Sequence, residues 1–203
     1  MTRKILFTIA LIVLAGALYL NFRTGIITGH SNLSGHEIGD AIDSLDGVMV
    51  YYNGKVSHTD GRNLSSDGYN IGLKYQCVEF AKRYYFEHYN HRMPDSYGHA
   101  KDFFNKGLAS GKRNTARNLY QFTNGSSTSP PLRGDLIVWD GNIYNPYGHI
   151  AVISAVSDRT VEIIQQNPGP NAPSRIQAEL VQTNGMWKVN LNEVLGWLGK
   201  RNP

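Results

Sequence analysis

Two apolar runs separated by three polar residues constrain the fold of this chain more than any other feature. Residues 149–156 (HIAVISAV) and 160–166 (TVEIIQQ) are rich in β-branched side chains, and Ser-Asp-Arg at 157–159 joins them. A connection this short can join only antiparallel strands. Another strand is predicted at 135–139 (DLIVW), and residues 186–191 are a candidate for one more. The second half of the chain is therefore expected to form an antiparallel sheet.

The first half of the chain carries a helical pattern. From Cys77 onward, apolar side chains recur at the i, i+3, i+4 spacing of an amphipathic helix, at Cys77, Phe80, Ala81, Tyr84 and Tyr85. This helix is expected to end near Tyr89. A second short helix is predicted at 100–108, and an edge strand at 46–52. Helices that precede an antiparallel sheet indicate the α+β class, with N-terminal helices packed on the sheet.

The N-terminal segment has the order typical of an export signal. A short basic region precedes residues 5–20, which carry no charge and include Ala-Gly-Ala at 15–17. The uncharged run is shorter than the ~20 apolar residues of a comfortable membrane-spanning helix. Residues 1–22 are therefore predicted to be a signal peptide or an N-terminal membrane anchor, 23–43 a linker and 44–203 a single domain. The alternative is a buried core helix at the terminus.

Export sets an expectation for where the protein works and for its only cysteine. The expected location is the periplasm, the cell envelope or the medium, with anchoring in the inner membrane if the segment stays uncleaved. A single cysteine cannot form an internal disulfide in an oxidising compartment, so Cys77 is a liability there unless it is buried or used. The alternative is that Cys77 is a small apolar residue on a buried helix face.

Composition and charge bear on the class of partner. With 41% hydrophobic and 18% charged residues, the chain can bury an ordinary core. The net charge is +4 and no basic block with interleaved aromatics occurs, so nucleic acid binding is not expected. A mild positive charge would suit an anionic polymer such as a bacterial wall. One cysteine with scattered histidines, and no CxxC or HxxxH spacing, predicts no metal site, and no cofactor is expected.

The predicted hairpin brings polar side chains to the start of its first strand. A loop at 157–159 would pair His149 with Asn167 and leave Gln165 on the neighbouring diagonal, on the same face. A loop at 156–158 would put Gln165 directly opposite His149. An even-numbered loop without a bulge would separate the two side chains onto opposite faces. Either odd-numbered loop therefore brings an amide to the imidazole.

A thiol at a helix start, an imidazole and a polar orienting group form a nucleophilic set. Backbone N–H groups and the helix dipole stabilise the thiolate of Cys77, and His149 would act as base and then protonate the leaving amine. The amide of Gln165 would fix the imidazole tautomer. The backbone N–H of Cys77, with Gln76, would receive the oxyanion. The alternative is that His149 is a strand-end residue bonded to backbone.

At these residues the sequence resembles the CHAP family of cysteine- and histidine-dependent amidohydrolases/peptidases. The resemblance covers residues ~45–200 in order, and the matching segments are 72–83, 124–126, 135–140, 148–153, 165–167 and 195–197. It implies a papain-like fold with Cys77 as nucleophile and His149 as base. The family usually has a glutamate where this chain has Gln165, and the lost charge is expected to lower the rate without abolishing the geometry.

Within that family the chain resembles the amidase domains of bifunctional glutathionylspermidine synthetase/amidases. The resemblance places Lys82 where an arginine contacts a substrate carboxylate, and a lysine is a weaker planar clamp. It also makes Asn167 a pocket residue. Together with Gln76 and Gln166, these are the expected substrate-binding residues.

The sequence therefore predicts an exported cysteine amidase or peptidase that forms an acyl-thioester on an amide substrate. Peptidoglycan peptide is the expected substrate, because an exported enzyme meets the cell wall. The first alternative is an amidase of the glutathionylspermidine type. The second is a binding protein that kept a CHAP-like pocket and lost turnover at Gln165.

Overall fold

The computed structural model describes residues 8–16, 19 and 35–201. Residues 8–16 are helical and exposed, and parts of the predicted signal or anchor segment and of the linker lie outside the described residues. In the described part of the chain, no helix combines the length and the apolar character needed to cross a membrane. Export and anchoring therefore stay predictions.

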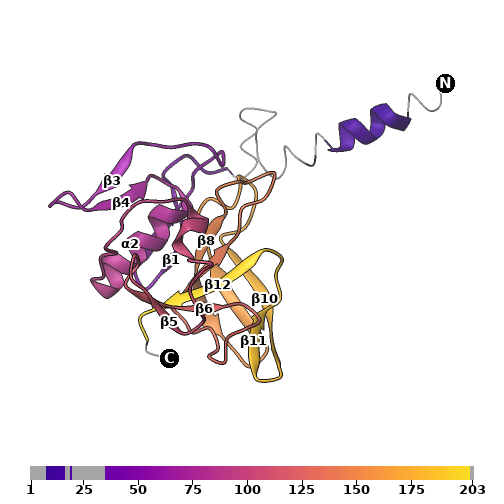
Figure 1. Cartoon of the computed structure of the whole chain (residues 1–203). Coiled ribbons are helices and arrows are strands. Elements are labelled where there is room, and N and C mark those ends of the chain that lie inside the picture. Colours follow the sequence, from indigo (N-terminus) through magenta and orange to yellow (C-terminus); the bar gives the residue numbers. More distant parts are fainter. Residues whose placement is uncertain (1–7, 17–18, 20–34, 202–203) are drawn as a thin grey trace.

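The second half of the chain is dominated by one antiparallel sheet, as predicted (Figure 1). Its eight strands lie in the order β11-β10-β9-β8-β7-β12-β6-β5. Their bounds are β5 Lys112–Asn114, β6 Leu119–Thr123, β7 Leu136–Trp139, β8 His149–Val156, β9 Thr160–Ile164, β10 Arg175–Thr183, β11 Met186–Val189 and β12 Val194–Gly199.

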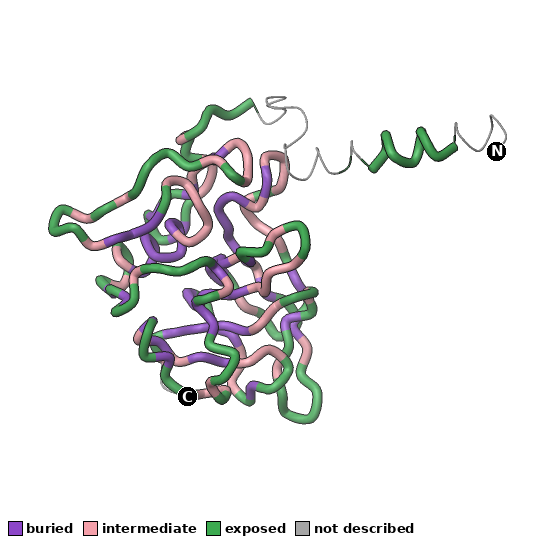
Figure 2. Tube along the Cα trace, turned by 45° about the horizontal axis from the view of Figure 1, so that its top comes forward, coloured by how far each residue is buried: buried purple, intermediate pink, exposed green. Residues whose placement is uncertain are grey.

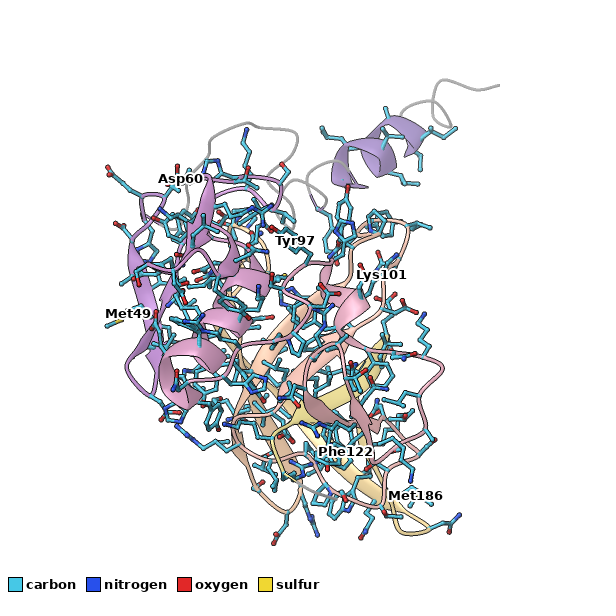
Figure 3. The ribbon with its side chains drawn as sticks, turned by 60° about the vertical axis from the view of Figure 1, so that its left-hand side comes forward. Met49, Asp60, Tyr97, Lys101, Phe122 and Met186 are labelled. Carbon is cyan, nitrogen blue, oxygen red and sulfur yellow. The ribbon has the colours of Figure 1, made fainter. Side chains whose placement is uncertain are left out.

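The sheet is curled, as hydrogen bonds between the segment after β6 and the edge strand β11 show. Gly125 donates its amide to the carbonyl of Trp187, and Trp187 donates its own amide to the carbonyl of Ser127, both at 2.8 Å. The curl encloses an apolar interior formed by Phe122, Ile137, Ala151, Ile153, Val161, Ile163, Ala178, Leu180, Val189 and Trp197. In Figure 3, Phe122 lies among these enclosed side chains, whereas Met186 projects from the tip of the β10–β11 hairpin.

A second core lies on the outer face of the sheet, under the helices. The helix α2 (Cys77–Tyr89) and the 3-10 helix η1 (Ala100–Phe103) pack there against the central strands. Both faces of β7 are therefore covered, which explains why Leu136, Ile137 and Val138 all have 0% exposure. Figure 2 shows the buried segments gathered along the sheet and the helix, with exposed hairpin tips around them.

The α+β class and the start of α2 at Cys77 are confirmed, whereas the helix predicted at 100–108 is shorter. It ends at Phe103, and Phe104 is extended with φ −102° and ψ 121°. The side chain of Asn105 accepts the amide of Gly107 at 3.0 Å, a local bond that competes with helix continuation.

The remaining strands of the described residues form two small hairpins. The strand β1 (Ala41–Leu45) pairs with β2 (Val48–Tyr51), which is the predicted edge strand, and β3 (Arg62–Leu64) pairs with β4 (Asn70–Leu73). Since β1 begins at Ala41, the last residues of the predicted linker lie in a strand.

The connection between β8 and β9 differs from the two odd-numbered loops, 157–159 and 156–158, that the sequence predicts. Val156 pairs with Val161, which leaves four residues in the connection, an even number. The register then shifts between Ile153 and Ala155, and beyond the bulge Val152 pairs with Ile164. The bulge restores the register of an odd-numbered loop, so the side chains of His149 and Gln165 still meet.

Candidate active site

Cys77 is the first residue of α2. Gln76 is its N-cap in an extended conformation, with φ −80° and ψ 160°. Gly72 allows the close approach of β4 to the first turn, because it has φ +146° and a Cβ there would lie 2.7 Å from the Cα of Glu79. The thiol is therefore presented by a helix start that is packed tightly onto the preceding strand.

The sulfur of Cys77 lies at the beginning of β8. The backbone amides of Ile150, Val78 and Cys77 itself lie close enough to the sulfur to lower the pKa of the thiol. Burial acts in the opposite direction and is the larger effect, and it raises the pKa of the Cys77 thiol to about 11. Since Ile150 directly follows His149 in the chain, the thiol lies beside the strand end that carries the imidazole.

His149 is the first residue of β8 and is half-buried. Its Nε2 lies 3.0 Å from Oε1 of Gln165. Burial lowers the pKa of His149 to about 4, although the bond to Gln165 opposes this shift. At neutral pH both the imidazole and the thiol are therefore uncharged.

Gln165 follows directly after β9 and is 5% exposed. Besides its bond to His149, it donates Nε2 to the carbonyl oxygen of Pro173 at 3.1 Å. Its backbone amide donates to the carbonyl of Ser174 at 2.8 Å. Both ends of the side chain thus have partners, one on the imidazole and one on the segment that leads into β10.

Gln166 is completely buried, and its side-chain amide bonds to β2 and to the first turns of α2. Its Oε1 accepts the amide of Tyr51 at 2.8 Å, and its Nε2 donates to Oε2 of Glu79 at 2.9 Å and to the carbonyl of Gln76 at 3.0 Å. Glu79 in turn forms a 2.7 Å ion pair with Arg83. The structure therefore places Gln166 as a link between β2 and the first turns of α2.

Gln76 and Asn167 both hold the connection between β2 and β3. Nε2 of Gln76 donates to the carbonyls of His58 and Val56, at 2.5 and 3.1 Å. Nδ2 of Asn167 donates to the carbonyl of Val56 at 2.9 Å and to Oε1 of Gln76 at 2.8 Å. The side-chain amide of Gln76 is thus occupied by bonds to its own connection and to Asn167.

Lys82 is 1% exposed and lies under the connection between α2 and η1. Its Nζ donates to the carbonyls of Asn70 and Ser96 and stands 4.9 Å from the ring centroid of Tyr69. Burial, with the nearby charge of Arg117, lowers the pKa of Lys82 to about 7. The ammonium is thus directed at backbone carbonyls.

Of the residues expected to be functional, the structure brings Cys77, His149 and Gln165 to one place, from α2, β8 and the end of β9. The sequence analysis missed Pro173, whose contribution is a backbone carbonyl and leaves no side-chain signal. It also missed the buried pair of Glu79 and Arg83, whose i, i+4 spacing is the one signal that could have indicated it. Within residues 8–16, 19 and 35–201, no His, Cys, Asp or Glu cluster suited to a metal ion occurs.

Comparison with known proteins places this site in a described family. Residues 67–167 match the profile of the CHAP domain. The chain is similar to the bifunctional glutathionylspermidine synthetase/amidase of Escherichia coli (strain K12), with 32% identity over 148 residues that cover 68% of this chain and 23% of that protein. It is also similar to trypanothione synthetase of Crithidia fasciculata, with 28% identity over 171 residues that cover 79% of this chain and 26% of that protein.

The chain thus spans only a minor part of the length of these relatives. Among solved structures, that of Ly7917 aligns with 51% of this chain and 38% of its own, at 20% identity and a TM-score of 0.31.

Proposed function

Since the chain carries a papain-like CHAP domain over residues 67–167 and belongs to that family, we propose that it is a cysteine amidase or peptidase with Cys77 as nucleophile and His149 as base. One observation carries the proposal. A helix-start thiol lies beside the strand end that bears an imidazole, and that imidazole is bonded to Gln165 through Nε2. This is the arrangement of nucleophile, base and orienting group that acyl transfer requires.

The reaction begins from a neutral pair. Nδ1 of His149 accepts the thiol proton of Cys77 while the sulfur attacks the amide carbonyl carbon, and the backbone N–H of Cys77 receives the developing oxyanion. When the tetrahedral intermediate collapses, the C–N bond breaks and the imidazolium returns the proton to the leaving amine. Water, deprotonated by His149, then attacks the acyl-thioester, and the carboxylic acid product and the free thiol are released.

Peptide of the bacterial wall is the proposed substrate. The uncharged N-terminal run after basic residues supports export, and an exported hydrolase meets peptidoglycan. The net charge of +4 suits an anionic wall polymer.

A glutathionylspermidine-type amide is the second candidate, favoured by the 32% identity to a protein described as a synthetase/amidase for that compound. The third is a binding protein without turnover, which the neutral Gln165 beside His149 would favour.

Mass spectrometry of reaction products tests the proposal. Purified wall fragments and glutathionylspermidine are incubated separately with the wild type, with Cys77→Ala and with His149→Ala. The proposal expects new amine and carboxyl ends in the wall fragments with the wild type alone. Cleavage of glutathionylspermidine alone would move the assignment to the second candidate. Retained binding of either substrate with no cleavage would support the third.

A further inference from the structure

The amide of Gln165 can satisfy both of its neighbours in only one orientation. The carbonyl oxygen of Pro173 is solely an acceptor, so the group that faces it at 3.1 Å must be the NH2 end. The oxygen end then faces Nε2 of His149 at 3.0 Å. An amide turned by 180° would direct oxygen at oxygen and leave the Pro173 carbonyl without its donor.

We infer that the Pro173 carbonyl is a positioning group that orients the Gln165 amide and thereby fixes neutral His149 with its proton on Nε2. Because Oε1 of Gln165 only accepts, Nε2 of the imidazole must donate. Nδ1 is then the unprotonated nitrogen, free to take the proton of the thiol. The inference rests on the proposed function, in which His149 is the base.

The segment that supplies this carbonyl is itself held in place. The backbone amide of Gln165 donates to Ser174, the residue after Pro173, at 2.8 Å. Oγ of Ser174 donates to the carboxylate of Asp43 at 2.7 Å, and Nε of Arg175 donates to the same carboxylate at 2.9 Å. The acceptor is therefore anchored to β1 as well as to the end of β9.

This arrangement distinguishes glutamine from glutamate at position 165. A carboxylate would meet the Pro173 carbonyl with a second acceptor, whereas a protonated carboxyl could donate to Pro173 and still accept from His149. The protonated form of Gln165→Glu is thus the mimic of the native side chain. A site built to stabilise an imidazolium would favour the ionised form instead.

The charged side chains nearest to Gln165 and behind Cys77 are paired, whereas Nε2 of His58, whose carbonyl accepts a bond from Gln76, is buried without a hydrogen-bond partner among the described residues. Arg175 bonds to Asp43 and to Glu162, and Glu79 bonds to Arg83 behind the active site. These paired groups leave the carboxyl introduced in Gln165→Glu as the new titrating group beside the imidazole. The thiol of Cys77 titrates well above the range of a carboxyl.

The tautomer can be measured without any substrate. The protein is labelled with 15N histidine, and the signals of His149, one of seven histidines, are assigned by their loss in His149→Gln. At pH 7 the wild type is expected to show a neutral ring with the proton on Nε2. A proton on Nδ1 would overturn the inference. If amide hydrolysis were absent and the Nε2–H form present, only the proposed function would fail.

The variant Gln165→Glu gives a second test, in which the direction of a pH-dependent change in the alkylation rate of Cys77 decides. The rate of Cys77 alkylation by iodoacetamide is measured from pH 4 to 9 and divided by the wild-type rate at each pH. Exposed Gln177 on β10 provides the matched control Gln177→Glu, whose ratio should stay constant. The ratio for Gln165→Glu is expected to fall about tenfold as pH rises through the carboxyl titration, the effect of losing one orienting hydrogen bond. A ratio that rises, or one that does not change with pH, would overturn the inference.

Discussion

Glu79 and Arg83 form a 2.7 Å ion pair whose side chains are only 2% and 6% exposed. Glu79 lies in the first turn of α2, which begins at Cys77, and it also accepts hydrogen bonds from Asn63 and Gln166. The first turns of α2 are therefore joined to β3 and to the segment after β9 through the Glu79 carboxylate, and to β2 through Arg83, which donates to the carbonyl of Met49.

Arg83→Met should destabilise the protein strongly, because it leaves the Glu79 carboxylate buried without its partner. The expected loss in the free energy of unfolding is about 3–5 kcal/mol, measured by urea denaturation. Lys106→Met is the control, because Lys106 pairs with Asp140 but is 61% exposed, and it should change stability little. Equal effects of the two variants would contradict the role assigned to the buried pair.

Gly72→Ala should displace the start of α2. The new Cβ would lie 2.7 Å from the Cα of Glu79, so a loss of more than about 2 kcal/mol in the free energy of unfolding and slower alkylation of Cys77 are expected. Gly61→Ala is the matched control, because Gly61 has φ +71° and nothing within 4 Å of an added Cβ. It should cost only the backbone strain, about 1 kcal/mol. A mild effect at Gly72 would show that β4 and α2 separate easily.

The reactivity of Cys77 should increase with pH well beyond neutrality. Burial raises the pKa of the thiol to about 11, so the thiolate fraction should grow about tenfold per pH unit between pH 7 and pH 10. Iodoacetamide alkylation followed by mass spectrometry gives the profile, and Cys77→Ala serves as the blank. A fast rate already at its plateau near pH 7 would instead indicate a resting thiolate–imidazolium pair.

His149 should make the folded state sensitive to acid. Its folded pKa of about 4 lies below the ordinary value of 6.5, so the unfolded chain binds the proton first as pH falls. This contribution to stability is complete above pH 6.5 and is lost between about pH 6.5 and pH 4. The free energy of unfolding of His149→Gln should therefore decline less than that of the wild type over this interval. Parallel curves would mean that the imidazole is not desolvated in the folded protein.

Much of the site followed from local sequence signals. The helix start at Cys77 followed from the i, i+3, i+4 pattern, and β8 and β9 followed from β-branched runs. The pairing of His149 with Gln165 was predicted, but through an odd-numbered loop. The structure reaches it through an even-numbered connection and a bulge at Ser154, between Ile153 and Ala155. One polar residue in an otherwise apolar strand does not by itself indicate a bulge.

The remaining features depend on contacts distant in sequence. The side chains of Gln76, Gln166 and Asn167, which are predicted to bind substrate, also bond to backbone carbonyls and buried groups that only the folded chain brings near. Whether any of them also contacts substrate stays a prediction. The strand β10 (Arg175–Thr183) was missed although its polar and apolar residues alternate and Asn184-Gly185, a strong hairpin signal, follows it directly.

The curl of the sheet has a consequence for Cys77 and His149, which lie at the start of β8. The strand that carries His149 contributes side chains to two cores, one around α2 and one around Trp197 inside the curl. A cavity made at Trp197, which is fully buried, would remove packing from the core that contains Ala151 and Ile153 of the same strand. We therefore expect the reactivity of the Cys77 sulfur to respond to packing defects in the core on the opposite face of the sheet.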